Sequence, residues 1–216
     1  MKKDYTHISM VIDRSGSMSS CWNDVVGGYK QIVKDNKELD GECTFTVAVF
    51  DDRYELIEDF TPIKKVDETL KVNPRNMTAL LDAIGKTITS VGEKLAEMKE
   101  EDRPSRVIFV INTDGLENSS REFTKDSVKK LIEEHTTKYS WQFQFIGASL
   151  DSVNDATSWG FNPSNVSTYN TNNSLATFSL LGEKMKTMRS ATTYDAYVKA
   201  SAFSDDDKVV LNSSKS

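Results

Sequence analysis

The chain has 216 residues, of which 38% are hydrophobic and 28% are charged, and its formal net charge is −6 with a pI near 5.1. This length suits one domain with a well-buried core. The acidic balance argues against a general nucleic-acid binder, which carries a basic face. No apolar run approaches the roughly 20 residues that span a bilayer. We therefore expect no nucleic-acid partner and no membrane partner.

The chain alternates strand and helix patterns from its N-terminus. Residues 6–13 form an apolar run without clean alternation, which is typical of a strand buried on both faces of a mostly parallel sheet. Apolar residues at helical spacing follow over residues 25–39. Two further strands are predicted at residues 42–50 and 53–60, and the second of them returns antiparallel at the sheet edge.

The second half continues this alternation. A long amphipathic helix is predicted over residues 78–99, and residues 106–114 form the most apolar strand, which we place at the sheet centre. The remaining predicted elements are helices near 123–137, 151–159 and 175–188 and strands at 141–149 and 165–169. The pattern indicates a Rossmann-like α/β fold, which is a doubly wound, mostly parallel sheet with one antiparallel edge strand and helices on both faces.

The domain is predicted to span residues 1–190. Residues 191–216 are rich in Ser, Thr, Asp and Lys with few apolar anchors, so we expect a polar, loosely ordered C-terminal tail. The N-terminal residues fit a strand better than a signal peptide, and Cys21 and Cys43 fit neither a metal spacing nor a disulfide framework. These features favour the cytoplasm of a bacterium or of an infected host cell.

Polar side chains come directly after predicted strands, where ligands bind in open α/β sheets. Asp13, Ser15 and Ser17 follow the first strand, Asp114 ends the central strand, and Thr78 begins the long helix. We expect these two carboxylates and three hydroxyls to converge on one edge of the sheet. They are hard oxygen ligands, which suit Mg²⁺, Mn²⁺ or Ca²⁺ and do not suit zinc or copper.

This set of residues resembles the metal-ion-dependent adhesion site of von Willebrand factor type A (vWA) domains. The family pattern is Asp-x-Ser-x-Ser, then a distant Thr, then a distant Asp, and the chain matches it at Asp13, Ser15, Ser17, Thr78 and Asp114. The matching order of secondary elements extends the resemblance over about residues 5 to 190. The chain also resembles the stand-alone intracellular vWA domains of bacteria and phages, including those linked to tellurite resistance.

The resemblance implies a role for each of these residues. Ser15 and Ser17 offer hydroxyl oxygens directly to the metal, and Thr78 does so directly in one loop state and through water in the other. Asp13 and Asp114 often bind through water and orient the hydroxyls. The metal keeps an open position, which the family fills with an Asp or Glu side chain of a partner protein. The implied cofactor is Mg²⁺, with Mn²⁺ or Ca²⁺ as the alternatives.

Other polar residues near the strand ends have simpler interpretations. Asp51 and Asp52 fit a turn, although they are also placed to support the site from the second strand. Glu117 fits a solvated loop. His7 and His135 stand alone in the sequence, and neither is predicted to have a role at the site.

The predicted function is metal-dependent, non-covalent protein binding, and the chain is predicted not to be an enzyme. The sequence lacks the second aspartate of a haloacid-dehalogenase-like phosphatase, the P-loop, the dinucleotide-binding glycine motif and the G-x-S-x-G motif with a partnered histidine. Two alternatives stay open. The first is a structural or assembly component that uses the fold as a building block, for example in a phage virion, and the second is a metal-assisted hydrolase.

Overall fold

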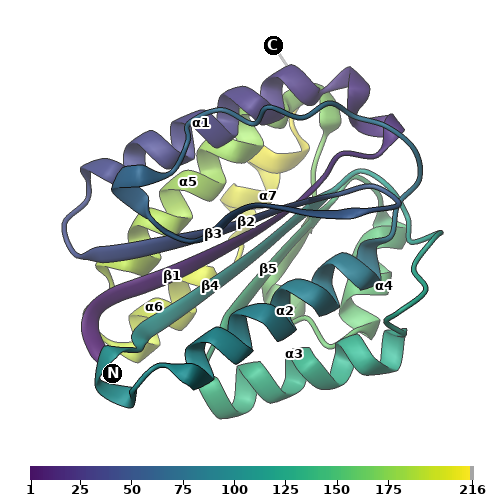
Figure 1. Ribbon diagram of the computed structural model, residues 1–216. Coiled ribbons are helices and arrows are strands. Elements are labelled where there is room, and N and C mark those ends of the chain that lie inside the picture. The colour runs from purple at the N-terminus through teal and green to yellow at the C-terminus, as the bar shows by residue number, and fades with distance from the viewer. Residues whose placement is uncertain (215–216) are drawn as a thin grey trace.

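The computed structural model describes residues 1–214 as a six-stranded sheet between two layers of helices (Figure 1). The strands are β1 Lys2–Asp13, β2 Glu42–Phe50, β3 Tyr54–Pro62, β4 Pro104–Thr113, β5 Gln142–Gly147 and β6 Val166–Thr168. They lie side by side in the order β3-β2-β1-β4-β5-β6, and β3 alone pairs antiparallel with its neighbour. The predicted mostly parallel sheet with one antiparallel edge strand is confirmed.

Helices cover both faces of this sheet (Figure 1). The α-helices are α1 Trp22–Glu38, α2 Leu80–Glu97, α3 Lys125–Tyr139, α4 Leu150–Ser158, α5 Ser174–Ser190, α6 Tyr194–Ser201 and α7 Asp205–Asn212. One face packs against α1, α5, α6 and α7, and the opposite face packs against α2, α3 and α4. Among residues 1–214, no helix is both long and apolar enough to cross a membrane.

The sheet separates two apolar cores, and β1 contributes to both. Ile8, Met10 and Ile12 pack towards α1 and α5, whereas Val11 packs towards α2 and α3. Successive side chains of a strand point to opposite faces, so a strand covered on both sides favours apolar residues at successive positions. Full burial of each such side chain contributes about 1.5–3 kcal/mol. This explains the apolar run without alternation in the sequence.

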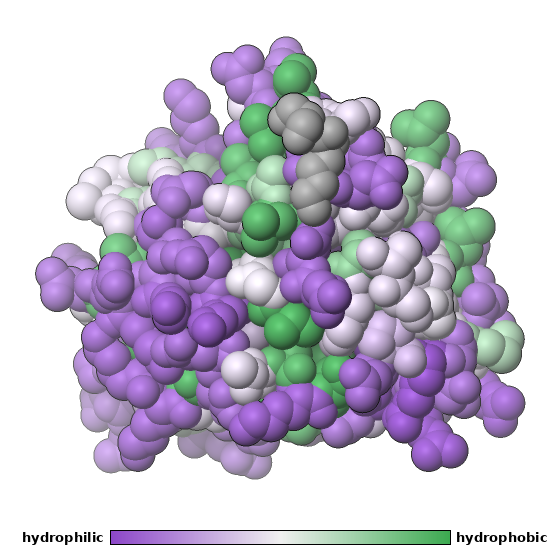
Figure 2. Space-filling model, turned by 90° about the horizontal axis from the view of Figure 1, so that it is seen from above, coloured by the Kyte–Doolittle hydropathy of each residue, from purple (hydrophilic) through white to green (hydrophobic). Residues whose placement is uncertain are grey.

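The layer that contains α1 is seen from above in Figure 2. This face is mainly hydrophilic, with a band of hydrophobic residues through its centre. Exposed apolar side chains on the helices of this layer include Leu175 of α5 and Val209 and Val210 of α7. The helices of this layer therefore turn apolar side chains towards the sheet and mainly polar side chains towards water.

The C-terminal residues belong to the fold, so the prediction of a loosely ordered tail over residues 191–216 is wrong for its described part. Residues 191–214 contain α6 and α7, and Tyr197, Phe203 and Leu211 are buried in the core beside α5. The Tyr197 hydroxyl donates a hydrogen bond to a backbone carbonyl of β4 at 2.7 Å. The folded domain thus extends past residue 190, while residues 215 and 216 lie outside the described part of the chain.

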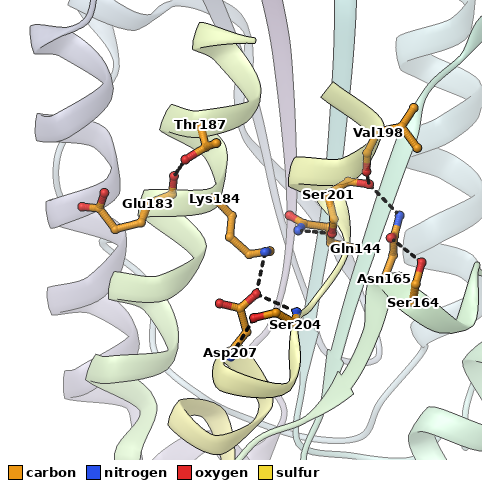
Figure 3. Close-up of polar contacts among 10 residues, drawn as sticks. All are labelled: Gln144, Ser164, Asn165, Glu183, Lys184, Thr187, Val198, Ser201, Ser204 and Asp207. Carbon is orange, nitrogen blue, oxygen red and sulfur yellow. Dashed lines mark hydrogen bonds and ion pairs between the residues drawn. The ribbon is translucent and has the colours of Figure 1, made fainter. Parts of the chain in front are cut away.

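Polar contacts also fix these C-terminal helices (Figure 3). The Gln144 side chain donates to the Ser201 carbonyl oxygen at 2.8 Å, and the Asn165 amide donates to the Ser201 hydroxyl at 3.1 Å. Lys184 of α5 pairs with Asp207 of α7 at 2.8 Å, and both side chains are largely buried. Asp207 also completes the capping box at the start of α7. Polar residues of the predicted tail therefore start a helix.

His7 is a buried imidazole in the middle of β1. Its Nδ1 lies 2.9 Å from Thr44 Oγ1 and its Nε2 lies 3.1 Å from Ser9 Oγ. Its ring stacks on Phe60, with the ring centroids 3.9 Å apart. Burial, with a smaller contribution from the charge of Lys94, lowers the pKa of His7 to about 3. The histidine is therefore neutral in the folded chain over most of the acidic range.

This histidine should make the fold sensitive to acid. Its pKa in the folded chain lies below its ordinary value of 6.5, so its stabilising contribution is complete above pH 6.5 and is lost as the pH falls towards 3. His7→Gln should reduce the slope of stability against pH by about 1.4 kcal/mol per pH unit between about pH 6 and pH 4. Urea unfolding at several pH values measures this difference. Parallel curves for the two proteins would contradict the neutral, buried state of His7.

Candidate metal centre

The five residues predicted as ligands meet at the carboxyl-terminal edge of the sheet. They are Asp13, Ser15, Ser17, Thr78 and Asp114. The two aspartates lie at the ends of β1 and β4, which are parallel neighbours and therefore end side by side. The serines lie at the start of the short 3-10 helix η1 Gly16–Ser20, and the threonine lies just before α2.

Hydrogen bonds join the hydroxyls and the carboxylates of this cluster. Ser15 Oγ lies 3.1 Å from Ser17 Oγ, and the Ser17 hydroxyl donates to Asp114 Oδ1 at 2.6 Å. Asp13 Oδ1 accepts the backbone N–H of Ser15 at 2.6 Å, and its Oδ2 accepts the Thr113 hydroxyl at 2.5 Å. The two carboxylates therefore orient the serine loop, and Thr113 fixes Asp13 in turn. Thr113 was not among the five residues predicted for the site.

Thr78 enters the cluster from a separate loop. A Cβ atom on Gly115 would lie 2.9 Å from Thr78 Oγ1 and 3.6 Å from Asp13 Oδ2, so both oxygens lie against this glycine. The backbone of Thr78 is held by Asn118, whose side chain accepts the Thr78 N–H at 3.0 Å and whose N–H donates to the Thr78 carbonyl at 3.1 Å. A side chain at position 115 would fill the space between these oxygens, which explains the glycine there.

The oxygen atoms of the cluster fit a divalent cation such as Mg²⁺. Neighbouring ligand oxygens in an octahedral site with bonds of about 2.0–2.1 Å are about 3 Å apart. The separation of 3.1 Å between the Ser15 and Ser17 hydroxyls matches this value. Over residues 1–214, no group of three or more His, Cys, Asp and Glu side chains is arranged to hold a metal. A cation in this cluster would therefore depend on hydroxyl oxygens for much of its coordination.

The buried surroundings of Asp13 and Asp114 disfavour the ionised form of both carboxyl groups. Burial raises the pKa of Asp13 to about 6, although the hydrogen bonds from Thr113 and Ser15 act in the opposite direction. Burial also raises the pKa of Asp114, against the hydrogen bond from Ser17. A cation at this edge would favour the ionised carboxylates and reverse both effects.

Buried charges hold together the loops that form the cluster. Asp51 follows β2, is fully buried and accepts a hydrogen bond from Arg75 Nε at 2.5 Å. Arg14, from the serine loop, lies 3.5 Å from the same carboxylate and 2.7 Å from Glu55, and it interacts through charge without aligned hydrogen bonds. Asp51 also accepts the N–H of Arg53 in a turn, as predicted. It therefore forms the turn and ties two site loops to β2.

Two further carboxylates fix the loop after β4 against the start of α2. Glu117 accepts the N–H of Leu81 at 2.8 Å, and Asp82 accepts the backbone N–H groups of residues 121–123 at 2.8–2.9 Å. These bonds satisfy free N–H groups at a helix start and in the loop. Glu117 is thus a capping residue beside Thr78, whereas the sequence favoured a solvated loop residue.

Comparison with solved structures supports this description of the fold. One similar structure is proximal thread matrix protein 1 from the mussel byssus with a zinc-occupied MIDAS motif, at a TM-score of 0.55 and 19% identity over 93% of this chain. Another is the manganese-loaded TRAP protein of Plasmodium vivax, at a TM-score of 0.53 and 13% identity over 82% of this chain and 72% of that chain. A third is a von Willebrand factor type A protein from Catenulispora acidiphila, at a TM-score of 0.56 and 12% identity over 86% of this chain and 43% of that chain. The chain has the von Willebrand factor type A fold.

The vWA similarity is one of structure. No protein-family model matches the sequence, and a comparison with curated protein sequences finds no match. This chain covers 47% of the mussel protein, so it spans about half of that relative. Within the vWA fold, the structure brings all five predicted residues into one cluster, and their role as metal ligands stays a prediction.

Proposed function

We propose that this vWA chain binds another protein non-covalently through a divalent cation held at Asp13, Ser15, Ser17, Thr78 and Asp114. The observation that carries the proposal is the hydrogen-bonded cluster of hydroxyls and carboxylates at the carboxyl-terminal edge of the sheet. Two structurally similar proteins add support, since one has a zinc-occupied MIDAS motif and the other is manganese-loaded. We favour Mg²⁺ for this chain, with Mn²⁺ or Ca²⁺ as alternatives, because its donors are all oxygen atoms.

Each side chain has a separate task in this proposal. Ser15, Ser17 and Thr78 would present neutral hydroxyl oxygens, and Asp13 and Asp114 would hold that arrangement through hydrogen bonds. A cation held mainly by neutral oxygens keeps most of its positive charge. One of its coordination positions would also stay free for a ligand from outside the chain. A carboxylate from an Asp or Glu of the partner is the group that best satisfies both properties.

The surroundings of the cluster favour a protein partner. Met77 precedes Thr78, Leu116 follows Asp114 by two residues, and Leu150 begins α4 after a two-residue loop that follows β5. All three apolar side chains are exposed on loops or helix starts at the carboxyl-terminal edge. Apolar side chains that gather around a polar site are typical of protein interaction surfaces.

We also propose that the chain is a binding protein without catalytic activity. Hydrolysis at the cluster would need a base that activates water. Of the two histidines, His7 bonds inside the sheet and His135 bonds to the backbone of α3, and neither contacts the cluster. The carboxylates of the cluster already accept hydrogen bonds from its own hydroxyls and N–H groups.

A matched pair of serines tests the proposed function. Ser17 donates to Asp114, whereas Ser19, two residues further along the same turn, donates only to the backbone carbonyl of Gly16. A partner that co-purifies with the chain in Mg²⁺ should be released by EDTA and should rebind when Mg²⁺ is restored. Ser17→Ala should lose at least tenfold in partner affinity, about 1.4 kcal/mol, and Ser19→Ala should keep it.

A structural building block is the second candidate function. It is favoured by the similarity to a thread matrix protein of the mussel byssus. In that case the cation would be incidental to assembly, in a virion for example. A partner retained through EDTA and by Ser17→Ala would contradict metal-dependent binding and support this second candidate.

A further inference from the structure

A cavity lies between α2 and α3 at the amino-terminal edge of the sheet, opposite the metal cluster. The two helices run along the same face of the sheet and end near each other (Figure 1). The cavity has a volume of about 630 Å³, and its apolar walls include Leu95, Val107, Leu131 and Trp141. Pockets of this size and lining typically hold small organic ligands.

His135 places a hydrogen-bond acceptor without a partner in the wall of this cavity. Its Nδ1 lies 2.7 Å from the carbonyl oxygen of Leu131, and a carbonyl can only accept, so Nδ1 carries the proton. Nε2 is therefore the bare nitrogen of the neutral ring, and it forms no hydrogen bond to any residue between 1 and 214. The side chain is only 8% exposed, and burial lowers its pKa, which keeps the ring neutral.

Gly92 of α2 lies directly beside this nitrogen. A Cβ atom at position 92 would lie 3.0 Å from His135 Nε2, and the three nearest atoms to it all belong to the His135 ring. Gly92 is also part of the cavity wall. Glycine within a helix costs about 1 kcal/mol relative to alanine, and at position 92 it lets α2 lie close to the His135 ring without crowding Nε2.

Aromatic rings surround the imidazole in the same cavity. The His135 ring centroid lies 4.4 Å from that of Trp141 and 5.4 Å from that of Tyr139. Tyr194 of α6 lines the cavity from the other side. Flat aromatic walls favour a flat aromatic ligand, which can stack on them or meet their edges. The charged residues of the lining carry both signs, which favours a neutral ligand: Arg103, Lys138, Glu93, Glu100 and Glu134.

We propose that this cavity binds a neutral, planar aromatic molecule whose N–H or O–H group donates a hydrogen bond to Nε2 of His135. The apolar walls exclude water from the ring faces of the ligand, and the acceptor on His135 sets its orientation. Because the cavity lies at the opposite edge of the sheet from the metal cluster, this site stands independently of the proposed metal-dependent function.

Indole and benzofuran test this proposal because they share one shape and differ in one donor. Indole carries an N–H group where benzofuran carries an ether oxygen. Each compound is titrated into the full-length, nitrogen-15-labelled chain, and the amide signals of residues around the cavity are followed by NMR. Indole should shift these signals saturably, and benzofuran should bind about 2- to 10-fold more weakly because one hydrogen bond is missing.

Two glycine variants give the matched comparison. Gly92→Ala places a methyl group in front of Nε2 and should reduce indole binding to the level of benzofuran. Gly27→Ala, in α1, adds a methyl group whose nearest neighbour is Leu175 at 4.0 Å, and it should leave the preference for indole unchanged. Both changes raise helix propensity, so the fold should be retained.

Three outcomes would overturn the proposal. The first is equal binding of indole and benzofuran to the wild-type chain. The second is a preference for indole that survives in Gly92→Ala. The third is a shift of the amide signals around the cavity with protein concentration before any ligand is added. This result would mean that a second copy of the chain occupies the cavity.

Discussion

Replacing Leu211 by alanine should lower the free energy of unfolding by about 2–5 kcal/mol, the usual cost of a large cavity in a core. Leu211 lies in α7, and its side chain is 0% exposed within the core that also contains Tyr197 and Phe203. The backbone carbonyl of Leu211 also accepts the N–H of Asn170, in the segment that leads from β6 into α5. The helix therefore stabilises the domain although it lies close to the C-terminus.

Val209→Ala in the same helix is the control for this prediction. Its side chain is 69% exposed, so the same kind of truncation should change stability by no more than about 0.5 kcal/mol. Urea unfolding monitored by tryptophan fluorescence measures both variants. Equal and small effects at the two positions would contradict a packed α7 and would restore the idea of a loose tail.

Asp114→Asn should remove the stabilisation that Mg²⁺ gives to the wild-type chain. A ligand at a hundred times its Kd adds about 2.7 kcal/mol to the free energy of unfolding. For a chain of this size that increment raises the thermal midpoint by about 5–10 °C. The variant keeps the shape of the side chain but removes its charge, so Mg²⁺ should produce little or no shift. Scanning calorimetry with and without Mg²⁺ measures the difference.

The stability of Asp114→Asn without Mg²⁺ and a second variant as a charge control complete this test. Burial raises the pKa of Asp114, so its ionised form costs stability at neutral pH, and Asp114→Asn should be at least as stable as the metal-free wild type. Asp52 is an exposed residue in the loop after β2, and its carboxylate accepts a hydrogen bond from the Asn76 side chain at 3.0 Å. Asp52→Asn removes one negative charge from this loop. It should keep the Mg²⁺ shift. An equal loss in both variants would indicate general charge attraction without a specific site.

The sheet and its polar edge could be predicted because their signals are local in the sequence. The apolar run that ends at Asp13 covers the buried part of β1, and the run that ends at Asp114 covers most of β4 and the residue that follows it. Parallel strands end at the same edge, so the order of elements was enough to bring these aspartates together. Ser15 and Ser17 followed from their positions in the same short loop.

The contacts of the supporting residues could not be predicted because their partners are distant in the chain. Glu117 caps α2 through Leu81, and Asp51 binds Arg75 from another loop. A carboxylate in a loop has the same sequence around it whether it is solvated or accepts hydrogen bonds from N–H groups of a separate element. Only the packing of the loops after β2 and β4 distinguishes these roles.

The C-terminal helices were missed for a different reason. Eight-residue helices such as α6 and α7 show barely two turns, so one or two apolar residues have to represent a whole buried face. Tyr197 is such an anchor in α6, and Leu211 is the buried residue of α7, where its apolar neighbours Val209 and Val210 are exposed. The capping box that starts α7 at Ser204 and Asp207 was the available signal, and it was included in the predicted polar tail.

Calorimetric titration of the metal-free chain with Mg²⁺ tests the central claim most directly. The five-residue cluster predicts one saturable site per chain in the wild type. It also predicts no measurable site when Asp13→Ala is combined with Asp114→Ala. A wild-type chain without a saturable site, or a double variant that binds Mg²⁺ as the wild type does, would contradict the assignment of this edge of the sheet as a metal centre.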